Sequence, residues 1–239
     1  MIIEFTKRKN FYDDLETELY GMDAVMTMCY NFTPVEIFDE HYILTSAKNL
    51  EGYLMDYKNN AKIKLYIENE NKEIECTKIQ LNNIVVFNSN TSNMYFSTQP
   101  DCYIDLLCDL LLIKFNSSKL NYIRINNNLN CDDLRYAEET IGLKYIWMDD
   151  KLELNTICKL AKILNVWTDK YINLPQIPLM IDIGIENNGT ELLQTPIIGS
   201  PVYDNNNNFF GIISPNIDHE NIVIIPLISI KKICDYVRL

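Results

Sequence analysis

Residues 196–203 read Pro-Ile-Ile-Gly-Ser-Pro-Val-Tyr, and residues 209–214 read Phe-Phe-Gly-Ile-Ile-Ser. The run between them, residues 204–208, is Asp-Asn-Asn-Asn-Asn. Asp and Asn are turn residues, because their short polar side chains hydrogen-bond to nearby backbone. Two short apolar segments on either side of such a turn predict a β-hairpin.

Segments of the same kind recur along the whole chain, bounded by Asn, Asp, Ser or Pro, and they predict a mainly β protein. In the first half they are residues 24–30, 42–47, 62–67, 73–80, 83–88 and 109–115. In the second half they are residues 139–148, 178–186, 191–195, 200–203, 209–214 and 221–226. A polar stretch between the halves indicates a linker. The predicted organisation is an N-terminal half (1–118), a linker (119–138) and a C-terminal half (139–239).

Three segments favour helices over strands. Residues 10–20 carry Phe11, Leu15 and Leu19 at near-helical spacing, with acidic residues in the first turn. Residues 152–165 and 227–238 each place apolar residues along one helical stripe, and the second follows Pro226. We therefore expect a leading helix, a helix inside the C-terminal half and a closing C-terminal helix.

Composition limits the classes of function. The chain has 239 residues and a net charge of -12, from 21 basic and 33 acidic residues. Such an acidic chain is repelled by phosphate, so direct nucleic-acid binding is disfavoured. The apolar runs are too short for a membrane span, and the first residues do not form a secretory signal, which favours a cytoplasmic or virion-associated protein. The Asn-, Ile- and Lys-rich bias is typical of AT-rich genomes, including those of some large viruses.

Cysteine and histidine usage predicts no metal site and no cofactor. The seven cysteines form an odd set without a CxxC pair, which favours free thiols in a reducing compartment. The two histidines, His41 and His219, lie far apart in the sequence, whereas a metal site needs several clustered ligands. We expect His41 to be a turn or surface residue, and His219 lies in a polar turn beside acids.

Three segments in one order resemble the motifs of trypsin-like serine proteases. Residues 42–48, Tyr-Ile-Leu-Thr-Ser-Ala-Lys, resemble the strand that ends in the catalytic histidine. Residues 109–115, Asp-Leu-Leu-Leu-Ile-Lys-Phe, resemble the aspartate motif, and residues 196–203 resemble the nucleophile loop. The separations are 61 residues (48 to 109) and 89 residues (109 to 198). The resemblance implies two six-stranded antiparallel β-barrels and a C-terminal helix.

The same resemblance implies that the catalytic site is degenerate. It places Lys48 at the base position, Asp109 at the orienting position and Ile198 at the nucleophile position. Isoleucine cannot attack a carbonyl, and an ammonium paired with a carboxylate stays protonated and cannot serve as a base.

One oxyanion-hole donor is lost as well. The family supplies it as a backbone N–H from the residue at position 196, which here is Pro196 and has none. Ser200 is the nearest hydroxyl to the nucleophile position, but it matches a family glycine.

These residues favour a non-enzymatic protein of trypsin-like fold, a pseudoprotease, that binds protein partners or serves as a structural component of an assembly. A virus-encoded virion component is one form of that hypothesis. Two alternatives are a hydrolase with a non-standard site at Ser200 or His41, and an unrelated β-rich structural protein. Hydrolase activity that is lost in Ser200→Ala or His41→Ala would favour the first alternative. A structure without two six-stranded barrels would favour the second.

Overall fold

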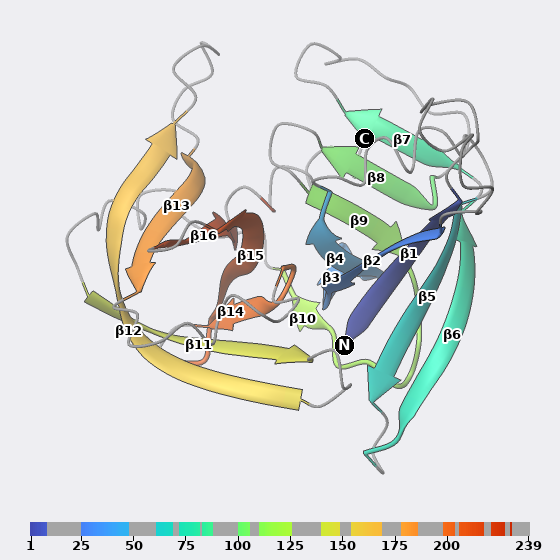
Figure 1. Cartoon of the computed structure of the whole chain (residues 1–239), viewed down its shortest axis with the longest axis horizontal. Helices are drawn as coiled ribbons and strands as arrows, with labels where there is room; N and C mark the ends of the chain where they lie inside the picture. The colour runs from blue at the N-terminus through green and yellow to red at the C-terminus, as the bar shows by residue number, and fades with distance from the viewer. Residues whose placement is uncertain are drawn as a thin grey trace, which may run out of the picture.

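The computed structural model describes the residues in the ranges 1–8, 25–47, 61–68, 72–81, 83–87, 100–105, 110–125, 140–148, 154–168, 178–185, 198–203, 206–217, 221–227 and 230. Within these residues the chain forms sixteen β-strands, which confirms the predicted mainly β fold class. Figure 1 shows two β-rich halves side by side, with the C-terminal strands on the left and the N-terminal strands on the right.

The N-terminal half consists of two sheets. One has four strands in the order β2–β1–β5–β6, and the other has six in the order β10–β3–β4–β9–β8–β7. The strands are β1 (Ile2–Arg8), β2 (Val25–Asn31), β3 (Thr33–Ile37), β4 (Glu40–Ser46), β5 (Ala61–Glu68), β6 (Ile74–Leu81), β7 (Ile84–Phe87), β8 (Cys102–Asp105), β9 (Leu110–Lys114) and β10 (Ile123–Arg124). The described strands of this half therefore form two sheets instead of the expected single six-stranded barrel.

The C-terminal half forms a closed ring of six strands in the order β11–β12–β13–β16–β15–β14. Its strands are β11 (Thr140–Met148), β12 (Leu154–Thr168), β13 (Pro178–Ile185), β14 (Pro201–Tyr203), β15 (Phe209–Ile217) and β16 (Asn221–Pro226). Pairing of β14 with both β11 and β15 closes the ring. The predicted hairpin around residues 204–208 is thus the β14–β15 pair.

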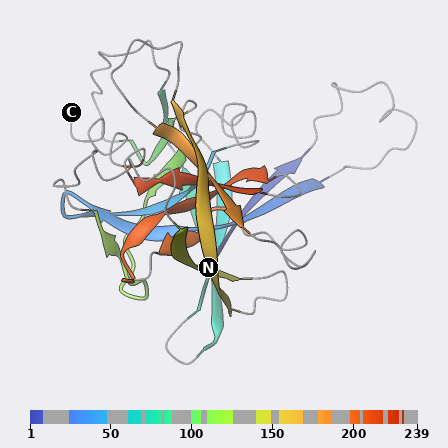
Figure 2. The same cartoon turned by 90° about the vertical axis from the view of Figure 1, so that its left-hand side faces the viewer.

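The helix expected at residues 152–165 is wrong, because residues 154–165 belong to the long strand β12. Figure 2 shows β12 as a long curved ribbon across the face of the ring. It pairs with β11 from Leu154 to Lys162 and with β13 from Ala161 to Thr168. Apolar residues spaced for a helix also suit a strand when they include β-branched types, and pairing on both sides decides between the two.

The other two predicted helices, at residues 10–20 and 227–238, are not described by the structure. Residues 10–20 lie wholly outside the described ranges, and of residues 227–238 only Leu227 and Ile230 are described. The linker expected at 119–138 is described as far as residue 125. Those first residues include β10, which pairs in parallel with β3 of the N-terminal half.

Strands β4 and β9 lie at the centre of the molecule, between two hydrophobic cores. Their residues alternate between the cores, as the two faces of a strand require. The N-terminal core contains Ile3, Phe5, Tyr30, Phe32, Ile43, Ala47, Ile63, Leu65, Ile67, Leu81, Cys102, Ile104, Leu111, Ile113 and Leu120. The shared core contains Val35, Ile37, Tyr42, Leu44, Val85, Tyr103, Leu110, Leu112, Ile125, Ile212, Ile225 and Ile230. Because the shared core takes residues from both halves, it joins them.

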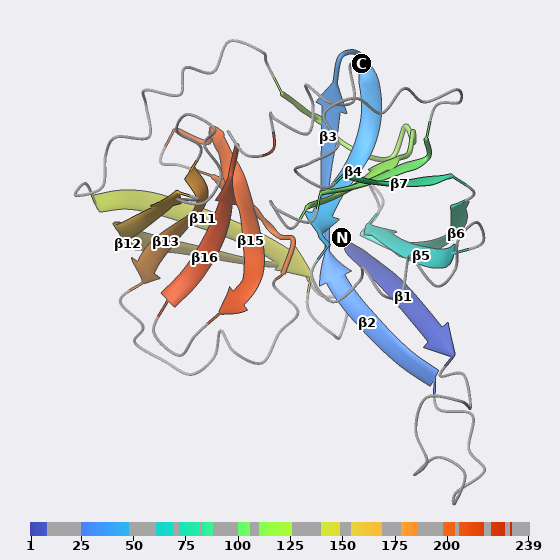
Figure 3. The same ribbon diagram turned by 90° about the horizontal axis from the view of Figure 1, so that it is seen from above.

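Figure 3 shows the consequence from above: β3 and β4 form the part of the N-terminal half that faces the C-terminal ring. The β1–β2 hairpin points away from the ring in this view. Of the residues in β1, only Ile2–Phe5 pair with β5. Among the described strands, residues 6–8 of β1 pair with β2 alone. The junction between the halves therefore lies at β3, at β4 and at Asn31, the last residue of β2.

Candidate functional site

Residues 198–200, which the resemblance places in the nucleophile loop, are bound to the N-terminal half through their backbone. The Asn31 amide donates to the Ile198 carbonyl over 2.7 Å. The Thr33 hydroxyl donates to the Gly199 carbonyl over 3.2 Å, in a buried position. These bonds connect segments separated by more than 160 residues, and they fix the loop beside the end of β2 and the start of β3.

Gly199 occupies a place where no other residue fits without a shift of the backbone. Its φ is +80°, in the left-handed region that favours glycine. A Cβ at this position would lie 2.1 Å from the Asn31 carbonyl oxygen and 2.3 Å from the Thr45 hydroxyl. This close approach places Gly199 against Thr45 of β4. Thr45 is three residues before Lys48 in the sequence.

The end of β4 is held by a third contact of the same kind. The Thr45 hydroxyl donates to the Asn31 carbonyl over 2.7 Å. Asn31 therefore gives its amide to the nucleophile loop and its carbonyl to β4, and it connects the two segments. Sequence reasoning did not single out Asn31 or Thr33, because nothing in the local pattern marks a residue whose backbone, or whose hydroxyl, bonds to a distant loop.

Three of the four predicted site residues, Lys48, Asp109 and Pro196, lie outside the described residues. Their described neighbours, however, come together. Ser46 is paired with Leu110 across the β4–β9 ladder, so the residues just before Lys48 and just after Asp109 lie at the same end of the central strands. The predicted pairing of the Lys48 ammonium with the Asp109 carboxylate stays a prediction.

Ile198, the fourth predicted site residue, is described, and it serves as a packing residue. Its side chain is partly buried against the N-terminal core. A branched alkyl group at this position offers no lone pair and no acidic proton. The side chain thus contributes apolar contact between the halves at the position that the sequence resemblance assigns to the nucleophile.

Ser200 is fully buried, and within the described residues its hydroxyl oxygen has no hydrogen-bond partner. Its backbone is part of the ring: the Gly199 amide donates to the Ile213 carbonyl, and the Ile213 amide donates to the Ser200 carbonyl. A serine nucleophile needs a base within hydrogen-bond reach and access for substrate. The described surroundings of Ser200 supply neither.

The six buried polar residues in the described part of the chain gather at this junction. They are Asn31, Thr33, Thr45, Ser46, Ser200 and Ser214. We call this set the polar seam. Burying a hydroxyl is unfavourable unless it is hydrogen-bonded, so the bonded members fix the geometry of the junction more than they add to its stability.

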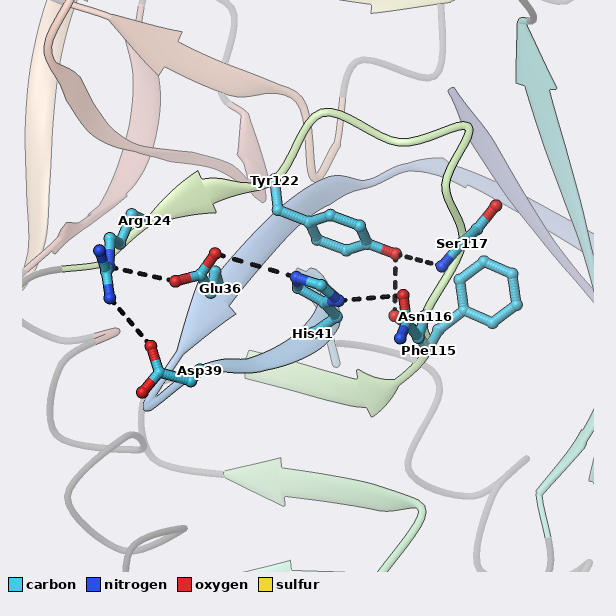
Figure 4. Close-up of polar contacts among 8 residues, drawn as sticks. All are labelled: Glu36, Asp39, His41, Phe115, Asn116, Ser117, Tyr122 and Arg124. Atoms are coloured by element: carbon cyan, nitrogen blue, oxygen red, sulfur yellow. Dashed lines mark hydrogen bonds and ion pairs between the residues drawn. The ribbon is translucent and has the colours of Figure 1, made fainter.

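His41 lies at the opposite end of β4 from the polar seam. Four residues of strand separate it from Thr45, about 13 Å at about 3.3 Å per residue. Figure 4 shows its ring stacked on Tyr122, with ring centroids 4.1 Å apart, and bonded through Nδ1 to the Asn116 side chain at 3.0 Å. Its Nε2 lies 3.8 Å from a Glu36 carboxylate oxygen. His41 therefore has a surface structural role, and His219 lies outside the described residues.

No group of metal-binding side chains occurs in the described residues. In this part of the chain, no three His, Cys, Asp or Glu side chains lie close enough together to hold a metal ion. Cys29, Cys76 and Cys102 are free thiols. Burial, with a smaller contribution from Asp101, raises the pKa of the Cys102 thiol well above its usual range. Such a thiol stays protonated and is a poor nucleophile.

The fold is that of the trypsin-like serine proteases. The chain is similar to the HtrA-type protease AlgW solved with a decapeptide, with a TM-score of 0.53, 14% sequence identity and coverage of 98% of this chain. It is also similar to Deg5, with a TM-score of 0.50, 11% identity and coverage of 97% of this chain. It spans 60% of the length of the first structure and 85% of the second.

At these identities the likeness concerns the fold alone. No protein-family model matches the sequence, and no curated protein matches it either. Among the described residues, no helix is long and apolar enough to cross a membrane.

Proposed function

We propose that this protein is a pseudoprotease, a trypsin-like fold without peptidase activity, and that it acts by binding protein partners or as a structural component of an assembly. The observation that carries the proposal is Ile198. The nucleophile position has an alkyl side chain, and that side chain packs against the N-terminal core.

The chemistry of the neighbouring positions supports the same conclusion. The resemblance places a lysine, Lys48, at the base position and an aspartate, Asp109, at the orienting position. A lysine paired with a carboxylate is held in its charged form and cannot accept a proton. Proline at position 196 has no N–H to offer an oxyanion. On this alignment the site lacks the nucleophile, the base and one oxyanion donor. The close approach of Gly199 to Thr45 supports the alignment, because it brings the nucleophile loop next to the end of β4.

The main alternative is a hydrolase with a non-standard site. It needs an activated hydroxyl or an accessible imidazole. Ser200 is buried, and its hydroxyl has no hydrogen-bond partner among the described residues. His41 lies about 13 Å along β4 from Thr45, the strand residue next to Gly199. The second alternative, an unrelated β-rich protein, does not agree with the likeness to the HtrA-type fold.

Cleavage of a peptide library, followed by mass spectrometry, separates the proposal from the hydrolase alternative. The parent protein, Ser200→Ala and His41→Ala should all leave the peptides intact, as buffer does. Cleavage by the parent that disappears in either variant would establish the alternative. Each variant's folding is checked by its unfolding midpoint, so that a loss of structure is not mistaken for a loss of chemistry.

The binding part of the proposal needs its own test. Affinity purification from the natural source should give a defined protein complex that is recovered again when the partner is the tagged component. The matched control Ile198→Val keeps the apolar contact of this position and the surface charge, and it should leave the complex intact. A protein that is monomeric in its source, with no partner recovered in both directions, would contradict a binding role. The AT-rich composition makes viral assembly the first context in which to look.

A further inference from the structure

Residues 115–125, which follow β9, form a segment that we call the latch. It contributes a buried side chain to each of the two cores: Leu120 to the N-terminal core and Ile125 to the shared core. These side chains are 6% and 7% exposed. The Ile125 amide also donates to the Glu36 carbonyl over 2.9 Å. The latch therefore contacts both of the apolar regions on which the junction between the halves depends.

Half-exposed ionic contacts hold the latch in place. Figure 4 shows Arg124 between two carboxylates: its Nε lies 3.1 Å from Glu36, and its Nη2 lies 2.9 Å from Asp39. Lys119 forms an ion pair with Glu75 of β6, on the other sheet. The side chains of Arg124 and Asp39 are 66% and 84% exposed, so salt screens their attraction.

Asp39 also lies in a strained turn. The β3–β4 hairpin turns through Phe38 and Asp39, which have φ values of 50° and 62°. Two-residue hairpin loops of this geometry favour Asn and Gly, and a bulky residue such as Phe is an outlier there. The Phe38 ring packs against the shared core, and the bond from Arg124 holds the neighbouring carboxylate. The latch and the turn thus stabilise each other.

The latch reaches the polar seam through the N-terminal core. Phe115 and Tyr122, both in the latch, pack against this core, and so does Ile198 of the nucleophile loop. At its other end, Ile125 shares a core with Ile212 and Ile225 of the ring. Among the described residues, the latch therefore packs in both of the cores that also receive side chains of the C-terminal half, and loosening it would weaken both.

We propose that the latch is a salt-sensitive coupling device: its ionic contacts hold residues 115–125 on the N-terminal half, and their release weakens the docking of residues 198–200 at the polar seam. The polar seam itself contains buried neutral hydrogen bonds, which salt hardly screens. Salt therefore acts on the seam through ion pairs around it, and Arg124→Gln distinguishes the latch from the other pairs, such as Lys114 with Glu40.

Two backbone amides report on the two ends of this coupling. The Ile125 amide, bonded to Glu36, reports on the latch, and the Asn31 amide, bonded to Ile198, reports on the seam. Native-state hydrogen exchange measures the opening of each bond. Leu112, in the central strand β9, serves as the internal reference, and the matched control variant is Lys78→Gln, an exposed lysine of β6.

Arg124→Gln should raise the exchange rate of Ile125 by about two- to tenfold, the range that the loss of two exposed ion pairs allows, with Leu112 unchanged. The rate of Asn31 should rise as well, by a smaller factor, and Lys78→Gln should change neither. A rise at Ile125 without a rise at Asn31 would overturn the coupling, and no rise at Ile125 would overturn the ionic latch.

A salt titration of the unmodified protein, with Arg124→Gln titrated beside it, tests the same coupling, because the variant lacks the Arg124 pairs and keeps the other ion pairs. Raising sodium chloride from about 0.05 M to about 0.5 M shortens the Debye length by about threefold. Exchange at Ile125 and Asn31 should then rise relative to Leu112. Equal salt dependence at all three amides would indicate a global effect and would overturn the proposal.

Discussion

The polar seam and the latch connect the same two halves by different physical means. In the seam, buried hydroxyls and amides bond to carbonyls at 2.7–3.2 Å, around a glycine that has no room for a side chain. In the latch, half-exposed arginine and lysine side chains reach carboxylates across two sheets. Buried neutral bonds depend on geometry, whereas exposed ion pairs depend on solvent and salt. The seam should therefore tolerate few substitutions, and the latch should tolerate many.

The largest effect is expected at Gly199. In Gly199→Ala the new Cβ would lie 2.1 Å from the Asn31 carbonyl oxygen, at a φ that alanine rarely adopts. Because the nearest atom is backbone, the two halves must separate or the loop must shift, and the loss of stability should be about 4 kcal/mol or more. Urea unfolding measures it. A loss below about 1 kcal/mol would mean that residue 199 does not lie against β2 and β4.

The next effect compares two hydroxyls of the seam, one bonded and one not. Thr45→Val keeps the shape of the side chain but removes the hydroxyl that donates to the buried Asn31 carbonyl, which should cost about 1–3 kcal/mol. Ser200→Ala removes a hydroxyl that has no partner in the described residues and should be neutral or stabilising. Unfolding midpoints of the two variants side by side test the comparison, and a larger loss in Ser200→Ala would reverse it.

The latch offers a smaller effect. Tyr122 donates to the Phe115 carbonyl and accepts from the Ser117 amide, both at 2.9 Å, while its ring stacks on His41. Tyr122→Phe keeps the stack and removes both bonds, so it should cost about 1 kcal/mol. Asn121→Ala, at the exposed neighbouring position, is the control and should change little. Equal effects of the two substitutions would show that the Tyr122 hydroxyl does not close this loop.

The smallest effect is a pH dependence. Hydrogen bonding to Lys114 lowers the pKa of the Glu40 carboxyl, against an opposing contribution from burial, and the Tyr42 hydroxyl lowers it further. A lowered carboxyl pKa stabilises the fold above the ordinary value of 4.5, and that stability is lost as the pH falls through the folded-state value. Because the Lys114 and Glu40 side chains are 34% and 39% exposed, solvent screens the pair, and Glu40→Gln should cost less than about 1 kcal/mol at pH 7. The difference from the parent should shrink at a pH of about 3, and a difference that grows there would contradict the assignment.

The sequence predicted the parts of the site that depend on short apolar strands. The predicted segments 42–47 and 109–115 overlap β4 and β9, and Ser46 at the end of β4 pairs with Leu110 at the start of β9. The positive φ of Gly199 and its close approach to Asn31 and Thr45 were not predicted, because they depend on residues far away in the chain.

What the sequence did not predict depends on contacts between distant segments. Leu160 and Ala161 fit a helical stripe, but strands pair with β12 on both sides. Leu120 lies in a polar stretch that resembles a linker, yet it is buried in the N-terminal core. In both cases the deciding interactions come from residues far away in the chain, and no local pattern contains them.

The most direct test of the account is covalent labelling of the unmodified, folded protein with a fluorophosphonate probe, measured by intact-mass spectrometry beside an active trypsin-like protease. The probe reacts with activated serines. A site that has isoleucine at position 198, and whose neighbouring Ser200 is buried with no hydrogen-bond partner among the described residues, should form no adduct under conditions that fully label the active enzyme. Labelling of one serine per chain, lost in Ser200→Ala or accompanied by substrate turnover, would contradict the pseudoprotease proposal.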